Sequence, residues 1–490
     1  MSLNPVSYKK KIEELFKHSL VYGITSSLQN LLGFIMLPIL TTFYTPDIFG
    51  VYSILLLLSA LTSAIFYLGA SSALGRFYFD EDSDLFRKKI LTTSLIVTLV
   101  GAGLLVVSGI IFSKRLSIQL FQTDIYARPI ELILLGTAFS FLLNLMTLFL
   151  RYEKKSFHFF LIIISGVIIN FSITYVLLSR YKFGLLAPIY GLLISNAICF
   201  LTLVLTRLHL LTKSLEVNHF RMILNFGIQS SVAGFLFYIL EWVDRLIIKD
   251  LLNLTDVGIY SLGYRLGSVM NILVIMPFTL VWGPLRMQHA KNSDADVFSG
   301  KVVSYYTLVG VMILVLAILF GEDVMKLIFA NKGYSAASKL FPIIMFSLFF
   351  YGYQNILDFG IYLHKKVYVY LLVSFFAIIF NVVMNYWLIP KFGYMASAYI
   401  TLLTYMITSI SIYLISNNYF KIRVETKRVI TALLSVPFLY SIINFLPITN
   451  FILKLVIGVT TFYLFYNFWL NKSERAYLNN KIAAFMISDK

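Results

Sequence analysis

Fourteen stretches of this 490-residue chain are long and apolar enough to cross a lipid bilayer as helices. A spanning helix needs about 20 predominantly apolar residues. In order along the chain, the predicted spans are residues 18–44, 49–75, 90–113, 129–150, 157–179, 184–206, 222–250, 257–284, 302–320, 339–363, 367–389, 393–416, 429–446 and 452–470. The alternating pattern of a membrane β-barrel is absent from the sequence. We therefore predict an all-α integral membrane protein with fourteen transmembrane helices.

The composition excludes a soluble or disordered chain. Apolar residues make up 59% of the sequence and charged residues only 13%, with a mean hydropathy of +0.84. A soluble domain carries about 25% charged residues. The net charge is +17, but the basic residues lie between apolar runs and do not form the clustered surface of a nucleic-acid-binding protein. We expect no nucleic-acid partner.

The basic residues predict how the chain is oriented in the membrane. With the N-terminus placed inside, the cytoplasmic segments hold 27 of the 40 Lys and Arg residues, and the outer segments hold 11. Cytoplasmic loops are enriched in these residues, so we expect both termini in the cytoplasm and the chain in a bacterial inner membrane. Residues 7–20 predict an interfacial helix on anionic headgroups, because their apolar side chains share one face and lysines lie elsewhere.

Two segments of the first half recur in the second half. Residues 22–27 (YGITSS) resemble residues 226–231 (FGIQSS), and residues 45–53 (TPDIFGVYS) resemble residues 255–261 (TDVGIYS). The offsets are nearly equal, about 204 and 208 residues, and both matches begin equivalent spans. The chain therefore looks like two copies of one helical bundle.

This repeat predicts the domain organisation. Residues 1–215 would form an N-terminal six-helix lobe with its interfacial helix, and residues 216–416 a C-terminal six-helix lobe. Residues 417–490 would add two transmembrane helices and a cytoplasmic tail. An even number of spans separates the copies, so they share one topology and form parallel repeats, an arrangement found in transporters that rock around a central site.

The chain resembles the polysaccharide flippases of the multidrug/oligosaccharidyl-lipid/polysaccharide exporter superfamily. The resemblance rests on five short patterns, at residues 23–27, 45–53, 69–78 (GASSALGRFY), 244–245 (Asp-Arg) and 260–265 (YSLGYR). Members of that group move lipid-linked oligosaccharides from the inner to the outer leaflet, and cationic cavity residues hold the lipid pyrophosphate. The multidrug branch typically has twelve helices, so two further spans favour the lipid-linked branch.

The resemblance implies a flippase for a polyprenyl-pyrophosphate-linked oligosaccharide, working by alternating access in cell-surface polysaccharide synthesis. Expected partners are this substrate, membrane lipids, an H⁺ or Na⁺ counter-ion, and the polymerase and glycosyltransferases of the same route. A multidrug or cation antiporter on the same scaffold stays open, as does a membrane polysaccharide polymerase or ligase. The latter would need a long outer loop, which the sequence lacks.

Ionisable residues within spans are candidates for function because burying them is expensive. The seventh span carries Glu241, Asp244 and Arg245, and the eighth carries Arg265. We predict that Arg245 and Arg265 bind substrate, since a guanidinium suits phosphate, and that Glu241 and Asp244 couple transport to an ion. The alternatives are an i, i+4 pair of Glu241 with Arg245, and a structural counter-ion role for Arg265.

Two further polar stripes are predicted to line the cavity. Gln354, Asn355 and Asp358 share one helix face in the tenth span. We assign the two amides to substrate binding and Asp358 to ion coupling, with pairing of Asp358 to Lys365 as the alternative. In the first span, Gln29 and Asn30 are predicted substrate contacts, although interhelical packing explains them equally well.

We expect no catalytic residue, no metal and no cofactor. The sequence has no Walker A motif, its single cysteine, Cys199, lies in an apolar run, and its six histidines show no ligand spacing.

Overall fold

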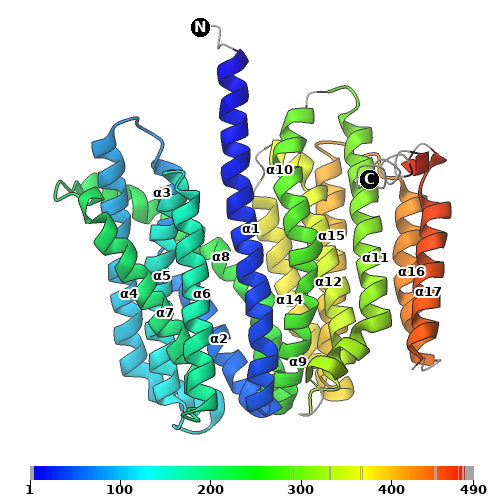
Figure 1. Cartoon of the computed structure of the whole chain (residues 1–490), viewed down its shortest axis with the longest axis horizontal. Helices are drawn as coiled ribbons and strands as arrows, with labels where there is room; N and C mark the ends of the chain where they lie inside the picture. The colour runs from blue at the N-terminus through cyan, green and yellow to red at the C-terminus, as the bar shows by residue number, and fades with distance from the viewer. Residues whose placement is uncertain are drawn as a thin grey trace, which may run out of the picture. The chain divides into compact units, whose positions relative to one another are not determined.

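The computed structural model describes residues 5–290, 292–329, 333–364, 366, 368–445, 450–472, 474–476 and 479, and every regular element in these residues is a helix (Figure 1). By their contacts the residues fall into two units. The first holds residues 1–261, 331–333 and 374–394, and the second holds the remainder. The predicted division at residues 215 and 416 follows the sequence repeat, not these contacts, and stays a prediction.

The elements that begin in the first unit are α1 (Pro5–Phe43), α2 (Pro46–Phe66), α3 (Ala70–Phe77), α4 (Asp84–Phe121), α5 (Ala127–Tyr152), α6 (Ser156–Ser179), α7 (Leu186–Arg207), η1 (Leu208–Leu210), α8 (Val217–Leu251), α9 (Leu254–Gly267) and α15 (Tyr394–Asn417). The elements that begin in the second unit are η2 (Asn271–Ile275), α10 (Met276–His289), α11 (Ala295–Phe329), α12 (Ala337–Leu357), α13 (Phe359–Leu363), α14 (Tyr368–Phe392), α16 (Thr426–Phe445), α17 (Phe451–Leu464) and η3 (Phe465–Trp469).

The number of spans agrees with the sequence prediction. Within the described residues, thirteen helices are long and apolar enough to cross a membrane, and α8, which bends by 42°, makes a fourteenth when it is taken as one span. The predicted all-α membrane fold is therefore confirmed. The helix α1 runs without a break from Pro5 into the first span, while the faces of residues 7–20 and the tail beyond residue 479 lie outside the described side chains.

Several predicted spans are interrupted in the structure. The second ends at Phe66, and α3 follows only after Leu68 and Gly69, which have positive φ angles of 52° and 60°. Gly69 is required there because a Cβ would lie 2.0 Å from the carbonyl oxygen of Gly227 in α8. The eighth span contains the π-helical turn η2, and the tenth breaks at Asp358. Conversely, α4 and α11 extend into the segments 114–128 and 321–338, which we predicted to be connectors.

Helix α5 is the packing centre of the first unit, where it contacts α2, α3, α4, α6 and α7. Its apolar residues, including Ile133 and Phe141, are buried in a cluster with Leu105 of α4 and Ile189 of α7. In the second unit, α11 contacts α12, α16 and α17. The two helices that follow the predicted repeats thus pack on α11, and apolar side chains such as Phe438 of α16 and Val456 of α17 remain exposed.

Two glycines at equivalent positions of the sequence repeat pack against each other inside the first unit. A Cβ on Gly50 of α2 would lie 2.0 Å from the carbonyl oxygen of Leu254, and one on Gly258 of α9 would lie 1.8 Å from that of Pro46. Without side chains at these positions the two backbones approach closely, as small residues allow at helix crossings in membranes.

We expect Gly258→Ala to lower stability by about 1–3 kcal/mol, because the added methyl overlaps a backbone oxygen that cannot rotate away. The measurement is the melting temperature of the purified protein in detergent. Gly103→Ala is the matched control, since a Cβ on Gly103 meets nothing within 4 Å. Equal melting temperatures for the two variants would show that the crossing is not tight.

Candidate functional site

A buried carboxylate in the first unit is held by hydrogen bonds from two other helices. Asp244 of α8 is only 1% exposed. It accepts a hydrogen bond from the Tyr260 hydroxyl at 2.6 Å and one from the Asn385 side-chain amide of α14 at 3.3 Å. The Asn385 amide also donates to the backbone and side-chain oxygens of Asn381, at 2.9 Å each. Two polar residues from α9 and α14 therefore bond one charge, and Asn381 of α14 bonds one of them.

The Asn385 side-chain oxygen has a different environment. It is buried and accepts no hydrogen bond from the described residues. Leaving a buried acceptor without a partner costs about 1–3 kcal/mol. The oxygens of Asp244, Asn381 and Asn385 together provide hard, partly anionic donors, which suit a proton or a small alkali cation. We missed Asn381 and Asn385 in the sequence, although two amides at i, i+4 within an apolar span are the same signal that identified Gln354 and Asn355.

Arg245 is buried next to this carboxylate. Its guanidinium lies over the rings of Trp242 and Tyr260, with its carbon 4.3 Å and 5.7 Å from the ring centroids. It also donates to the backbone carbonyl of Glu241 at 2.9 Å. Aromatic faces stabilise a cation where water is excluded. The structure thus brings Glu241, Asp244 and Arg245 together, as their spacing implied.

A second buried charge cluster lies in the other unit, at the break between α12 and α13. Asp358 forms an ion pair with Arg286 of α10 at 2.6 Å and accepts a hydrogen bond from the Tyr370 hydroxyl. The side chains of Arg286 and Asp358 are only 12% and 10% exposed. The guanidinium also lies 4.2 Å from the centroid of Tyr362. Lys365, the alternative partner of Asp358, lies outside the described residues.

Arg286 lies just beyond the predicted eighth span, residues 257–284. The structure continues α10 to His289 and so places Arg286 within a helix. The position of Arg286 at the end of an apolar run concealed this role, because the partner carboxylate is 72 residues away in sequence.

The remaining predicted substrate contacts differ in burial. Gln354 donates to the hydroxyl of Thr408 in α15 at 2.8 Å, and the Asn355 backbone oxygen accepts from Arg286 at 3.4 Å. These two residues therefore adjoin the Asp358 cluster. In the first unit, Gln29 of α1 is exposed and Asn30 is half-buried, and in the second unit the Arg265 side chain of α9 is exposed.

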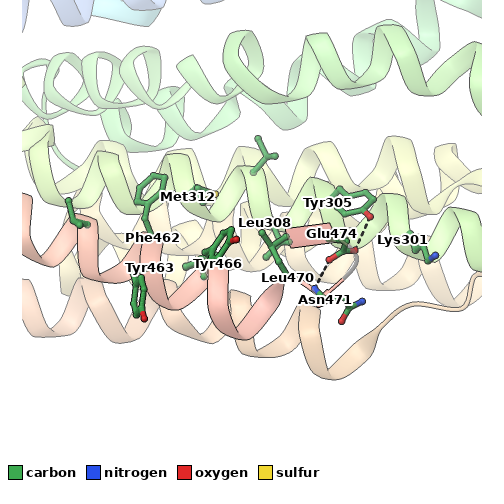
Figure 2. Close-up of a pocket in the computed structure, with 13 residues that line it drawn as sticks. Lys301, Tyr305, Leu308, Met312, Phe462, Tyr463, Tyr466, Leu470, Asn471 and Glu474 are labelled. Atoms are coloured by element: carbon green, nitrogen blue, oxygen red, sulfur yellow. Dashed lines mark hydrogen bonds between the residues drawn. The ribbon is translucent and has the colours of Figure 1, made fainter. Parts of the chain in front are cut away.

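The second unit also contains a groove of about 1130 Å³ between α11 and the segment formed by α17 and η3 (Figure 2). It is lined by Lys301, Tyr305, Leu308, Val309, Met312, Val459, Phe462, Tyr463, Phe465, Tyr466, Leu470, Asn471 and Glu474. None of the residues predicted from the sequence to bind substrate or ions lines it.

Sequence comparison shows the family of the chain. Residues 39–339 match the family described as polysaccharide biosynthesis protein, and the chain belongs to that family. It is 23% identical over 267 residues to Lsg locus putative protein 1 of Haemophilus influenzae, which covers 53% of this chain and 63% of that protein. The match thus spans less than two thirds of the relative.

Structural comparison shows a transporter fold. The chain superposes on a lipid II flippase MurJ in its inward closed conformation with a TM-score of 0.74 at 16% identity, covering 91% of this chain and 98% of that one. An inward-facing multidrug resistance MATE family transporter of the MOP superfamily gives 0.65 at 14% identity, covering 80% and 94%. The resemblance stated from the sequence is therefore confirmed.

We expect Arg286→Ala to destabilise the protein by about 3–5 kcal/mol, because it leaves the Asp358 carboxylate buried without its counter-ion. Adding Asp358→Asn should recover much of the loss, since no buried charge then remains. Unfolding of the purified single and double variants in detergent measures both effects. If the double variant is no more stable than Arg286→Ala, the pair does not depend on charge compensation.

Proposed function

We propose that this protein is a flippase that carries a polyprenyl-pyrophosphate-linked oligosaccharide from the inner to the outer leaflet by alternating access. The observation that carries the proposal is membership of a polysaccharide biosynthesis family together with a transporter fold. A lipid-linked glycan must cross the bilayer before it can reach the cell surface. Family membership supports a cargo from polysaccharide synthesis, and the transporter fold supports its movement across the membrane.

An exposed arginine supports an anionic cargo, and a buried carboxylate supports a coupling cation. Arg265, which has an exposed side chain on α9, is proposed to bind the pyrophosphate by bidentate hydrogen bonds. Gln29, Asn30, Gln354 and Asn355 would contact the sugars. The aromatic faces around Arg245 make it a positioning residue for the adjacent carboxylate. This assignment changes the earlier prediction that Arg245 itself binds substrate.

The proposed orientation has both termini in the cytoplasm of a bacterial inner membrane, as the distribution of Lys and Arg predicts. In that orientation, an anion that moves outward follows the inside-negative potential, which contributes about 2.3 kcal/mol per charge per 100 mV. The membrane potential alone could then drive much of the transport, and a coupling cation would add to it.

We propose Asp244, with Asn381 and Asn385, as the cation site. A proton or Na⁺ there would meet the carboxylate and the buried Asn385 oxygen that accepts no hydrogen bond from the described residues. Asp358 is the weaker candidate of the two, because Arg286 already compensates its charge. Glu241 remains a candidate for ion coupling, because it lies one helical turn from Asp244 and Arg245.

Depletion of the protein should make the lipid-linked oligosaccharide accumulate on the cytoplasmic leaflet. In depleted cells we expect Arg265→Ala to restore no more than about one tenth of the transport that the natural protein restores. The reason is that a hydrogen bond to a charged group contributes about 1.5–3 kcal/mol. Arg265→Lys should retain part of the activity because it keeps the charge.

The matched control is Arg180→Ala, which removes an exposed arginine at the end of α6. Full transport by both Arg265 variants would remove this residue from the site. Absence of accumulation on depletion, combined with drug resistance on overexpression, would instead support the multidrug antiporter.

We expect Asp244→Asn to abolish the dependence of transport on a Na⁺ or H⁺ gradient in reconstituted vesicles, because the substitution keeps the shape and removes the charge. Asp250→Asn is the control, since Asp250 is an exposed carboxylate at the end of the same helix. Gradient dependence that persists in Asp244→Asn would place the coupling ion elsewhere or leave the membrane potential as the only driving force.

A further inference from the structure

Helix α10 is attached to its neighbours by side chains on one of its faces. The Trp282 ring lies 6.3 Å from the ring of Phe298 in α11, and the His289 ring stacks on the same residue at 4.4 Å. Between these two contacts, Arg286 forms its ion pair with Asp358. Positions 282, 286 and 289 are spaced i, i+4 and i+7, so the three attachments form one stripe along the helix.

The other side of α10 contributes little to this attachment. The side chains of Leu280, Val281 and Met287 are 57%, 64% and 48% exposed. A Cβ on Gly283 would meet nothing within 4 Å. The ion pair of Arg286 and the two aromatic contacts beside it therefore hold the helix in place.

The start of α10 has the features of a bend. The π-helical turn η2 ends at Ile275, directly before α10 begins. Pro277 has no N–H to donate to the carbonyl oxygen of Leu273 in the preceding turn. Helices bend sharply at π-turns and at prolines, because backbone hydrogen bonds are lost there. Release of the contacts farther along α10 would therefore let the helix swing about η2.

The first repeat is divided at the equivalent place. Helix α2 ends at Phe66 and α3 begins at Ala70. The repeat offset of about 208 residues places these two positions at about 274 and 278, where η2 ends and α10 begins. Helix α3 is therefore the counterpart of α10.

The repeat also extends to the segments around Asp358. Residues 154–155 (KK), Asn170 and residues 182–184 (KFG) recur as residues 365–366, Asn381 and residues 391–393, at offsets of 209 to 211. The end of α5 is thus the counterpart of the break between α12 and α13.

The two repeats fasten these counterparts by different chemistry. At these offsets Arg286 corresponds to Tyr78 and Asp358 to Thr147. Tyr78 lies directly after α3 and stacks on Tyr152 at the end of α5, with the ring centroids 5.3 Å apart. A phosphate cannot replace either ring of this stack, whereas it can replace a carboxylate on a guanidinium. Of the two attachments, the one in the second repeat can therefore respond to an anion.

Arg286 also has a donor that Asp358 does not use. Its Nη1 donates to the Asp358 carboxylate at 2.6 Å and to the Asn355 backbone oxygen at 3.4 Å. Its Nε is buried and forms no hydrogen bond to a described residue. A guanidinium binds phosphate through two parallel N–H groups, so a phosphate oxygen can bond Nε before the carboxylate leaves. A pyrophosphate carries more negative charge than one carboxylate, which favours the exchange.

We propose that the ion pair of Arg286 and Asp358 is a latch that the anionic headgroup of the cargo opens. A pyrophosphate takes the place of Asp358 on Arg286, and α10 then swings about η2. The latch rests on the proposed function for the chemistry of the cargo, a lipid pyrophosphate. It gives Arg286 a role in sensing that cargo, separate from the role proposed for Arg265.

The experiment follows the position of α10 in the full-length purified protein through the distance between two spin labels. One label is attached at Gln288 of α10 and the other at Asn418 after α15, because both side chains are exposed. Cys199, the single cysteine of the sequence, is only 2% exposed and should not react. The ligands are farnesyl pyrophosphate and farnesol, which share one hydrocarbon chain and differ in the anion. We expect farnesyl pyrophosphate to shift the distance and farnesol to leave it unchanged.

Substitutions in the latch test the exchange itself. Asp358→Asn should lower the farnesyl pyrophosphate concentration at half-maximal shift about tenfold, the equivalent of about 1.4 kcal/mol, because the competing charge is gone. Asp296→Asn is the matched control, since it removes the carboxylate of the Arg423 ion pair in the same unit and should leave that concentration unchanged. The double variant Arg286→Ala, Asp358→Asn should not respond to the anion.

Four results would overturn the latch: an unchanged distance with farnesyl pyrophosphate, an equal shift with farnesol, equal affinities of Asp358→Asn and the natural protein, or a shift in the double variant. These results are separate from the depletion experiment. An unchanged distance together with intact transport rejects the latch and leaves the flippase. A shift without accumulation of lipid-linked oligosaccharide on depletion rejects the flippase and leaves the latch.

Discussion

A polar group inside a hydrocarbon layer must find its hydrogen-bond partner within the protein, because lipid chains offer none. This constraint makes every described regular element a helix, since a helix satisfies its own backbone. It also determines what happens to the few charges that the spans contain. Asp244 is bonded by side chains from α9 and α14, and Asp358 by side chains from α10 and α14. Each buried carboxylate thus joins helices that are distant in sequence.

One irregular part of the helices lies at these charges, because the break between α12 and α13 falls at Asp358 itself. The π-helical turn η2 comes directly before α10, and Arg286 lies eleven residues beyond its end. Such turns change the direction of a helix and free backbone groups, and they are common at functional sites. The break at Asp358 therefore coincides with a buried ion pair.

The fold and the charged residues support different parts of the proposed function. A transporter fold is shared by proteins that handle very different cargo, so the fold alone does not identify the substrate. In this chain, family membership points to a polysaccharide precursor, an exposed arginine to its phosphate, and a buried carboxylate with two amides to a cation.

The spans could be predicted from the sequence because about 20 apolar residues in succession have one stable arrangement in a bilayer. The same reasoning found Asp244, Arg245 and Asp358, since an ionisable residue is conspicuous in an apolar run. It could not find the partners. Arg286 pairs with Asp358 from a helix 72 residues away, and position 69 requires glycine because a Cβ there would overlap the backbone of Gly227. The sequence by itself determined which segments enter the membrane, because hydrophobicity is a local property. Only the tertiary structure decided which charges meet and where helices break, because those depend on contacts between helices that are far apart along the chain.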